Sequence, residues 1–463
     1  MKKAAAFLMA IFMAVGVEAQ RYDVAVEKPV GLSLRPAVEN RCFTSKAVDK
    51  CIEKTCKKIA DPKLRWMFAN CFPNTLDTTV KTWGEDDSFV ITGDIPAMWL
   101  RDSAAQVWPY LRFCKEDKEL AKLVRGLIRR QMRCLLLDPY ANAFNLSADS
   151  MSPNWKDDLT LMKPGVFERK YELDSQCYPF RLARGYVKAT GDASVLDDLY
   201  KRALAKVRAV MEYQRKRDWS HEEQFLNGYS DEMEYQFMRV THAMHDTQSN
   251  RGMGHPGKPC GLIASAFRPS DDATVYPYLI PSNLMAAQMW LEVGDTAFSD
   301  AIRRAVEREA IVDHPKYGRI YAYEVDGFGN RLLMDDANVP SLLSLPYIAP
   351  DVIDEEVYRN TRRFVLSTDN PYYFEGAAGK GIGGPHVGLG AIWPMSVIMQ
   401  ALTSEDAAEI ADCIELLKNT DGGMGQIHES FSRETANKYT RGWFAWANTL
   451  FGELIYKTIW NKN

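Results

Sequence analysis

Apolar side chains recur at helix-like spacing through most of the chain, and the strict alternation typical of half-buried strands is rare. The clearest helical stretches are 104–114, 120–136, 194–215, 286–291, 297–310, 355–364, 408–417 and 443–459. Long connections rich in Gly, Pro, Asp and aromatic residues separate them, notably 139–172, 217–276, 369–388 and 420–440. Connections longer than about 15 residues are usually functional or disordered. Their aromatic content argues against disorder, so the pattern predicts a helical protein with functional loops.

A cluster of polar or charged residues precedes a helix-like segment six times. The clusters are GDIPAMWLRDS from 93, YELDSQCYPF from 171, FRPSDDATVYPYLIPSN from 267, MDDANVPSLLSLPY from 334, GGPHVGLGAIWPMS from 383 and TRGWFAWANTLF from 440. If each cluster opens an inner helix with an outer partner, the chain forms a closed ring of six helical hairpins. The pattern therefore predicts an all-α (α/α)6 toroid, with one domain over 20–463 and one central pocket.

Ordinary helix capping is the alternative explanation of these clusters, because Ser, Asp and Asn satisfy free backbone N–H groups at a helix start. Capping would explain Ser270 or Asp336. It does not explain the Trp, Arg and His residues that stand beside them.

The first residues resemble a secretion signal. Lys2 and Lys3 precede an uncharged, mostly apolar run over 4–17, and small residues stand ahead of Gln20. A run of 14 residues is short of the roughly 20 needed to span a bilayer. We expect residues 1–19 to be a cleaved signal peptide and the mature protein to be periplasmic or secreted, without a membrane segment. A short N-terminal anchor is the alternative.

Composition excludes several classes. With 46% apolar residues and 57 basic against 61 acidic side chains, the chain is too apolar and too close to neutral for a disordered protein. The net charge of −4 lacks the basic excess that nucleic acid binding needs. Among nine cysteines, we expect one or two disulfides within the group Cys42, Cys51, Cys56 and Cys71, and most of the others buried as thiols.

Carboxylates provide the strongest chemical signal. Asp271 and Asp272 stand together at a probable helix start, and Glu429 follows a Gly-rich segment ahead of the last helix. Hydrolysis of a glycosidic bond needs one protonated carboxyl group for the leaving oxygen and one ionised carboxylate for water or carbon. The alternative for each acid is a helix cap or a solvated turn.

Aromatic residues favour a sugar ligand, since a pyranose stacks on aromatic rings while its hydroxyls need charged partners. Six tryptophans lie in or near the clusters and loops: Trp99, Trp108, Trp155, Trp393, Trp443 and Trp446. We expect about half of them to be core residues only. Arg101 and Asp102 form either a structural ion pair or a bidentate site for sugar hydroxyls.

Other motifs carry little weight. Residues 379–384 match GxGxxG, but neither a preceding hydrophobic strand nor a βαβ pattern accompanies them. His242, His245 and Asp246 could bind a metal, yet the seven histidines are dispersed and HExxH is absent. The sequence also lacks GxSxG, so a serine hydrolase of the α/β type is not supported. We expect neither a metal nor a cofactor.

With these residues in view, the sequence resembles glycoside hydrolase family 125, the exo-acting α-1,6-mannosidases. The matching motifs run in order from about residue 40 to the C-terminus and include GDIPAMWLRDSAAQVWPY, YELDSQCYP, GLIASAFRPSDDA, YLIPSN, LMDDANVPSLLSLPY, GIGGPH, LLKNTDGGMGQIHESF and RGWFAWANTLF. The resemblance implies an (α/α)6 toroid, metal-independent inverting hydrolysis, and release of mannose from the non-reducing end of α-1,6-linked mannose oligosaccharides.

By the same resemblance, Asp272 is the general acid, with Asp271 as the alternative, and Glu429 is the general base. Trp99, Arg101, Asp102, Asp271 and His386 would bind the sugar. An inverting enzyme holds its two carboxyl groups roughly 6.5–9.5 Å apart. The connection between Asn283 and His314 is shorter than the family pattern, which should affect an outer hairpin rather than the pocket.

Two rival functions follow from the same residues. A non-catalytic exported sugar-binding protein would keep the pocket without needing both carboxylates. A polysaccharide lyase would need a basic cleft for uronates, which the acidic balance disfavours. We expect the protein to act as a monomer.

Overall fold

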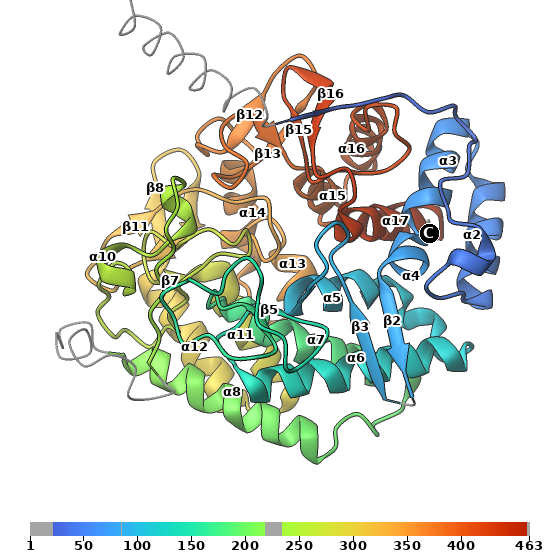
Figure 1. Ribbon diagram of the computed structural model, residues 1–463. Coiled ribbons are helices and arrows are strands. Elements are labelled where there is room, and N and C mark those ends of the chain that lie inside the picture. The colour runs from blue at the N-terminus through green and yellow to red at the C-terminus, as the bar shows by residue number, and fades with distance from the viewer. Residues whose placement is uncertain (1–21, 85, 218–233, 461–463) are drawn as a thin grey trace, which may run out of the picture.

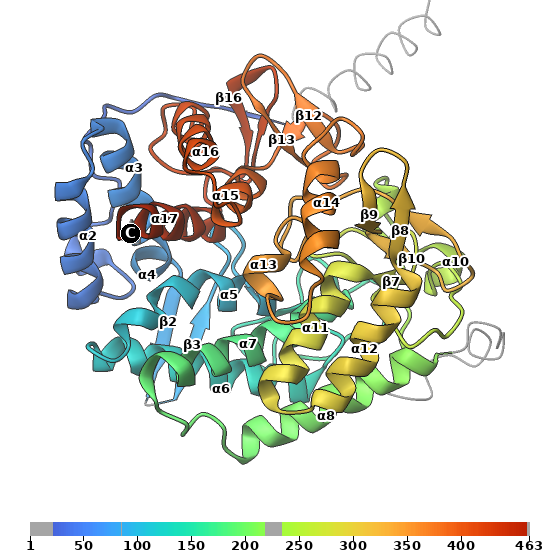
Figure 2. The same cartoon turned by 180° about the vertical axis from the view of Figure 1, so that it is seen from behind.

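The computed structural model describes residues 22–84, 86–217 and 234–460, and its helices form two concentric rings (Figures 1 and 2). The predicted signal peptide lies outside the described residues. The inner helices are α5 (Leu100–Val107), α7 (Leu173–Thr190), α11 (Ile280–Val293), α13 (Leu345–Ile348), α15 (Pro394–Leu402) and α17 (Ala445–Trp460). The outer helices are α2 (Lys46–Lys58), α3 (Pro62–Cys71), α6 (Lys118–Leu137), α8 (Asp198–Lys216), α12 (Thr296–Glu309), α14 (Glu355–Val365) and α16 (Ala407–Asn419).

The inner ring closes between the two ends of the chain. Helix α5 packs against α7, α7 against α11, α11 against α13, and α15 against α17, which returns to α5. The outer partner of α17 comes from the N-terminus, because α2 and α3 pack on it (Figure 1). Each of the six predicted clusters directly precedes or opens one inner helix. The predicted toroid is confirmed.

Helix starts differ between the rings. The outer helices α6, α8, α12, α14 and α16 each begin at an Asp whose side chain accepts a backbone N–H of the first turn. The inner helices α5, α7, α11, α13 and α15 have no side-chain cap at their described N-termini. The capping explanation therefore holds for the outer ring and fails for these five clusters, whose polar groups serve another purpose.

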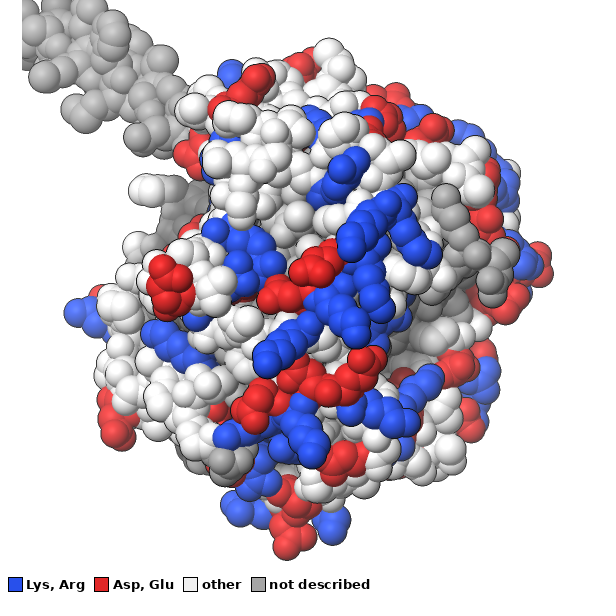
Figure 3. Space-filling model, turned by 90° about the vertical axis from the view of Figure 1, so that its right-hand side faces the viewer, with Lys and Arg blue, Asp and Glu red and all other residues white. Residues whose placement is uncertain are grey.

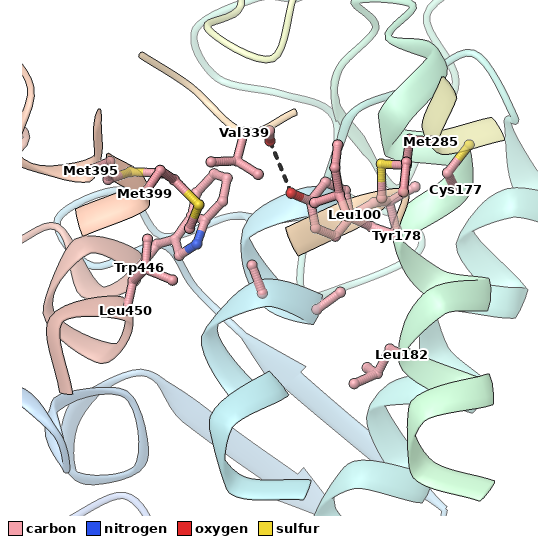
Figure 4. Close-up of a cluster of buried hydrophobic side chains, with 14 of the residues drawn as sticks. Leu100, Cys177, Tyr178, Leu182, Met285, Val339, Met395, Met399, Trp446 and Leu450 are labelled. Carbon is pink, nitrogen blue, oxygen red and sulfur yellow. Dashed lines mark hydrogen bonds between the residues drawn. The ribbon is translucent and has the colours of Figure 1, made fainter. Parts of the chain in front are cut away.

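Side chains of five inner helices fill the axis of the ring beneath these N-termini (Figure 4). Tyr178 of α7 donates a hydrogen bond to the carbonyl of Val339 at 2.9 Å, and Trp446 of α17 lies near Met395 and Met399 of α15. Inner helices are buried all round: every residue of α5 is buried, and so is every residue of α17 from Ala445 to Ile455. Such helices lack the amphipathic period, which makes them harder to recognise. Sequence periodicity found the outer helices α6 and α12 and the inner helix α17, but it missed α7 and α15.

Short sheets set the entry of several inner helices. Strand β4 (Met98–Trp99) leads into α5, β7 (Tyr278–Leu279) into α11, and β14 (Ala391–Ile392) leads to α15. Two sheets have three strands: β4 pairs with β5 (Ala143–Phe144) and β6 (Val166–Glu168), and β7 with β10 (Glu324–Val325) and β11 (Arg331–Leu332). One sheet has four strands, in the order β1 (Asp23–Val24), β16 (Thr435–Thr440), β15 (Ser430–Ser432) and β14. Three hairpins pair β2 (Val80–Trp83) with β3 (Asp87–Val90), β8 (Ile311–His314) with β9 (Gly318–Tyr321), and β12 (Tyr373–Glu375) with β13 (Lys380–Ile382). Strands of two to six residues are too short to show alternation in a sequence. The smaller helices are α4 (Asn74–Thr78), α10 (Ser249–Gly252), η1 (Val38–Asn40), η2 (Trp108–Phe113) and η3 (Met244–Asp246).

The predicted disulfides near the N-terminus are wrong, because all nine cysteines are free. Cys51 contacts Thr55 within α2, whereas the buried Cys71 of α3 donates to the carbonyl of Gly425 and Cys42 is exposed. Four of the five remaining cysteines are buried, as predicted, and Cys260 is partly exposed.

The short connection between Asn283 and His314 forms the end of α11, a tight turn at Gly294 and the outer helix α12. The described chain contains no helix long and apolar enough to cross a bilayer. On the side of the molecule that faces right in Figure 1, acidic and basic side chains are intermixed (Figure 3).

Candidate active site

A cavity opens at the end of the ring where the inner helices begin. It has a volume of about 360 Å³, counted out to its open mouth. The lining residues are Thr92, Ile95, Trp99, Arg101, Asp102, Pro269, Ser270, Asp271, Asn338, His386, Trp393, Glu429, Arg441 and Phe444. None of them comes from the connection between 284 and 313. The cavity brings together every predicted site residue except Asp272.

Arg101 is the centre of the charge network. Its buried guanidinium donates to Glu172, to Asp174 at 3.3 Å and to Asp271 at 3.0 Å, and its Nε lies 3.6 Å from Asp102. The sequence offered a structural ion pair between Arg101 and Asp102 as one of two alternatives, and the structure shows a larger network. One cation serves four carboxyl groups, and three of the four lie on elements distant in sequence.

Burial changes the protonation of these acids. Desolvation raises the pKa of Asp102 and that of Asp174 to about 6 each, and raises the pKa of Glu172 well above its usual value, against the attraction of Arg101. Asp271 behaves in the opposite way. Although burial alone would raise its pKa, Arg101 and a hydrogen bond from Glu172 hold the pKa of Asp271 below its usual range.

The adjacent aspartates occupy different environments. Asp271 has a left-handed backbone (φ 67°), which Asp tolerates better than most residues, and its side chain is 23% exposed in the cavity. Asp272 is 1% exposed, and its carboxylate accepts from His245 Nδ1 at 2.7 Å, His386 Nδ1 at 3.1 Å and Ser270 Oγ at 3.1 Å. Asp271 therefore faces the cavity, and Asp272 orients two histidines behind it.

Glu429 lines the cavity opposite the start of α5. It is buried directly before β15 of the hairpin formed by β15 and β16. Thr440 Oγ1 donates to it at 2.9 Å and Arg441 Nη1 at 3.2 Å, and Arg441 in turn binds Asp94 at 2.7 Å. These bonds fix the orientation of the carboxylate in the cavity.

Two of the six predicted tryptophans line the cavity. The indole nitrogens of Trp99 and Trp393 are buried without a hydrogen-bond partner, as is Nε of Arg101. A buried unpaired donor is unfavourable by about 1–3 kcal/mol. Three such donors around one cavity are typical of a site completed by water or by a polar ligand. Trp446 belongs to the core, as expected for about half of the set.

His245, Asp272 and His386 are the one group of described residues whose ligand atoms are close enough for a metal ion. The carboxylate of Asp272 outweighs the effect of burial and raises the pKa of His386 to about 9. A ring that keeps its proton at neutral pH lacks the lone pair that a metal requires. The contacts fit an ion pair between His386 and Asp272 better than a metal centre.

Sequence reasoning missed four residues of the network: Glu172, Asn142, Lys170 and Arg441. His245 was considered only as a metal ligand. Glu172 and Arg441 stand within two of the six clusters, so the clusters themselves could have indicated them. Asn142 and Lys170 lie in a long loop, and a single sequence gives no signal for them.

Comparisons with known proteins agree on one family. The family model described as metal-independent alpha-mannosidase (GH125) matches residues 61–456. The "Meiotically up-regulated gene 157 protein" of Schizosaccharomyces pombe is 42% identical over 455 residues, covering 92% of this chain and 88% of that protein. A solved structure of a metal-independent alpha mannosidase from Streptococcus pneumoniae, in a non-productive complex with alpha-1,6-mannobiose, is 37% identical with a TM-score of 0.82. It covers 91% of this chain and 100% of the solved chain.

Proposed function

The chain belongs to the metal-independent α-mannosidases of glycoside hydrolase family 125, and from this premise we propose that it is an exo-acting α-1,6-mannosidase that works with inversion. It would release single mannose units from the non-reducing end of mannosides such as N-glycan or mannan fragments. One observation carries the proposal. Two carboxyl groups, Asp271 and Glu429, line the same small cavity, and each is held by its own arginine.

The shape of the cavity supports exo action. The cavity is small, and Arg101 and Asp102 are buried in its lining. A small cavity accepts one terminal sugar ring and leaves the rest of the chain at the mouth. The linkage is taken from the relative solved with alpha-1,6-mannobiose.

The catalytic roles follow from which groups can reach the substrate. We assign proton donation to Asp271 rather than to the initially favoured Asp272, because the carboxylate of Asp272 is occupied by His245 and His386. Glu429 takes a proton from the water that attacks the anomeric carbon, while the bond to the leaving oxygen breaks and that oxygen gains the proton from Asp271.

The sugar ring is bound mainly by donors that lack a hydrogen-bond partner without it. Trp99 and Trp393 offer their indole N–H groups and ring faces, Asp102 offers carboxylate oxygens, and Arg101 offers Nε. His386 completes the cavity wall beside Asp271.

The test follows the hydrolysis of α-1,6- and α-1,2-linked mannobiose by proton NMR, which reads linkage and product anomer together. We expect β-mannose from the 1,6 isomer only. An α product would remove the inverting mechanism, and equal release from the 1,2 isomer would remove the linkage preference.

Glu429→Gln separates catalysis from binding. The variant should lose mannose release by about 10³-fold or more while it still binds mannobiose in calorimetry. The rival function, a non-catalytic sugar-binding protein, predicts no release by the wild-type protein either.

We also propose that the protein is exported, which rests on the pattern of its first 19 residues. Mass spectrometry of the protein from its native cells should find Gln20 as the first residue. An intact N-terminus would contradict export by a cleaved signal.

A further inference from the structure

The network around Arg101 contains more acid than base. Asp102, Glu172, Asp174 and Asp271 all lie within ion-pair distance of this one guanidinium. Four buried carboxylates cannot all remain ionised beside one cation, since an uncompensated buried charge is strongly unfavourable. The geometry alone therefore requires that some of these acids keep a proton.

Burial favours the protonated form of Glu172. Its side chain is fully buried at the start of α7, and Asn142 Nδ2 donates to Oε1 at 3.2 Å while Ser175 Oγ donates to Oε2 at 2.7 Å. The same Asn142 Nδ2 donates to Asp271 Oδ1 at 3.5 Å, and Arg101 donates to both acids, so the two carboxyl groups lie side by side. Two carboxyl groups can share a hydrogen bond only if one of them carries a proton.

We propose that Glu172 and Asp271 share one proton and that Glu172 is the positioning residue that stores this proton for the acid. The inference rests on the proposed function, because it supplies the proton that Asp271 must donate in that reaction. Asp271 touches the cavity, but beside Arg101 it is ionised at rest and cannot donate. Glu172 holds the proton without reaching the cavity.

The proton follows a closed cycle. As the glycosidic C–O bond breaks, the shared proton moves from Glu172 to Asp271, and Asp271 passes it to the leaving oxygen. Glu429 takes a proton from the attacking water as its oxygen bonds to the anomeric carbon. After product release, Glu429 returns a proton to solvent and the pair regains one from solvent.

The other groups that face the pair explain why the proton rests on Glu172. Asp271 has three cations near it: Arg101 donates to its carboxylate, Lys170 donates to its backbone carbonyl at 2.7 Å, and His386 lies close by. Glu172 has Arg101 as its cation and stands beside the carboxyl group of Asp174 in α7. The charged and titratable groups around the pair include Arg101 and Asp102 of α5, Asp174 of α7, Glu168 of β6, Lys170, Asp246 and Asp272 of the loops, and His386 ahead of α15.

Glu172→Gln tests the proposal, because the amide can still donate to Asp271 but cannot release a proton to it. On α-1,6-mannobiose at pH 7, kcat/KM should fall by at least about 10-fold, and the alkaline limb of its pH profile should move to lower pH by more than about one unit. The shift has this sign because the remaining proton would sit on Asp271 beside Arg101, where it is lost earlier. KM should change little.

The same variant on α-mannosyl fluoride gives the decisive contrast. Fluoride leaves without full protonation, so kcat/KM should fall by less than about 3-fold. Equal losses on both substrates would make Glu172 a structural or binding residue and overturn the proposal. An unmoved alkaline limb would also overturn it.

Two further variants serve as controls. Ser175→Ala removes a hydrogen bond at the same carboxyl group without removing a titratable group, and its alkaline limb should stay near that of the wild type. Glu172→Asp should have an alkaline limb at a pH between those of the wild type and Glu172→Gln. It replaces Glu172→Gln in the test if Glu172→Gln fails to fold. If the wild-type protein releases no mannose, the proposed function is wrong. If the wild-type protein is active but the alkaline limb of Glu172→Gln does not move, only the role of Glu172 is wrong.

Discussion

The two ends of the inner helices carry opposite chemistry. Helices α5, α7 and α17 begin at the candidate active site and end at a second cavity of about 920 Å³. The first end gathers buried carboxyl groups around Arg101. The second is mostly apolar, lined by Trp108 and Tyr456, with the cations Arg112, Lys188 and Lys457 at its edge.

Helix direction accounts for much of this difference. Free N–H groups at a helix N-terminus favour anions, and free carbonyls at the C-terminus favour cations. Lys188 and Lys457 stand in the last turns of α7 and α17, whereas Asp102 and Asp174 stand in the first turns of α5 and α7. A ring whose inner helices start on one side thus concentrates acids there, and the acids can then be used for catalysis.

The adjacent aspartates should give the largest effect at the acidic end. Asp271→Asn should lower kcat/KM on α-1,6-mannobiose by about 10²–10⁴-fold and spare α-mannosyl fluoride, because only the disaccharide needs a proton donor. Asp272→Asn should be milder and should affect both substrates equally, since it disturbs His245 and His386. Steady-state kinetics on the two substrates measure the contrast, and the reverse pattern would return the acid role to Asp272.

Arg101→Met should give the largest loss of stability. The variant leaves four buried carboxyl groups without their cation, and its free energy of unfolding at pH 7 should fall by about 3–5 kcal/mol. Denaturant unfolding measures it. The loss should shrink at pH 5, where Asp102 and Asp174 are protonated in the fold, and a loss independent of pH would mean that packing rather than charge is responsible.

The other end should respond to packing alone. A Cβ at Gly185 of α7 would lie 2.4 Å from the ring of Trp108, so Gly185→Ala should destabilise by about 1–3 kcal/mol. The kcat for mannose release should stay at the wild-type value. The exposed Lys188→Ala is the matched control at the same end and should change stability by less than about 0.5 kcal/mol. A drop in kcat for Gly185→Ala would show that the two ends are coupled.

His386 should give the smallest effect. Its pKa is raised to about 9, so the charged ring stabilises the fold fully below pH 6.5, and this contribution is lost as the pH rises through 9. The free energy of unfolding should fall by about 1–2 kcal/mol between pH 6.5 and 9 for this reason. Thermal unfolding across this range should show a flatter profile for His386→Asn, and an unchanged profile would remove the charged contact with Asp272.

The outer ring and the inner ring were not equally predictable. The outer helices α6 and α12 have one apolar face, so periodicity found them nearly to their ends. Helix α7 is buried on most sides and contains Pro179, so the sequence pattern did not indicate a helix there. The polar cluster at its start was recognised. The disulfides were predicted from sequence proximity alone, and thiols near each other in sequence point to different parts of the core.

The sequence alone determined the ring of helical hairpins, the family and six of the residues that line the cavity, because buried helix starts need polar residues at regular intervals. Only the tertiary structure decided which acids meet. It placed Glu172 against Asp271 and gave one arginine four carboxyl groups, and it turned Asp271 toward the cavity and Asp272 away from it. The physical reason is that protonation depends on burial and on neighbours from distant segments, and neither is visible along the chain.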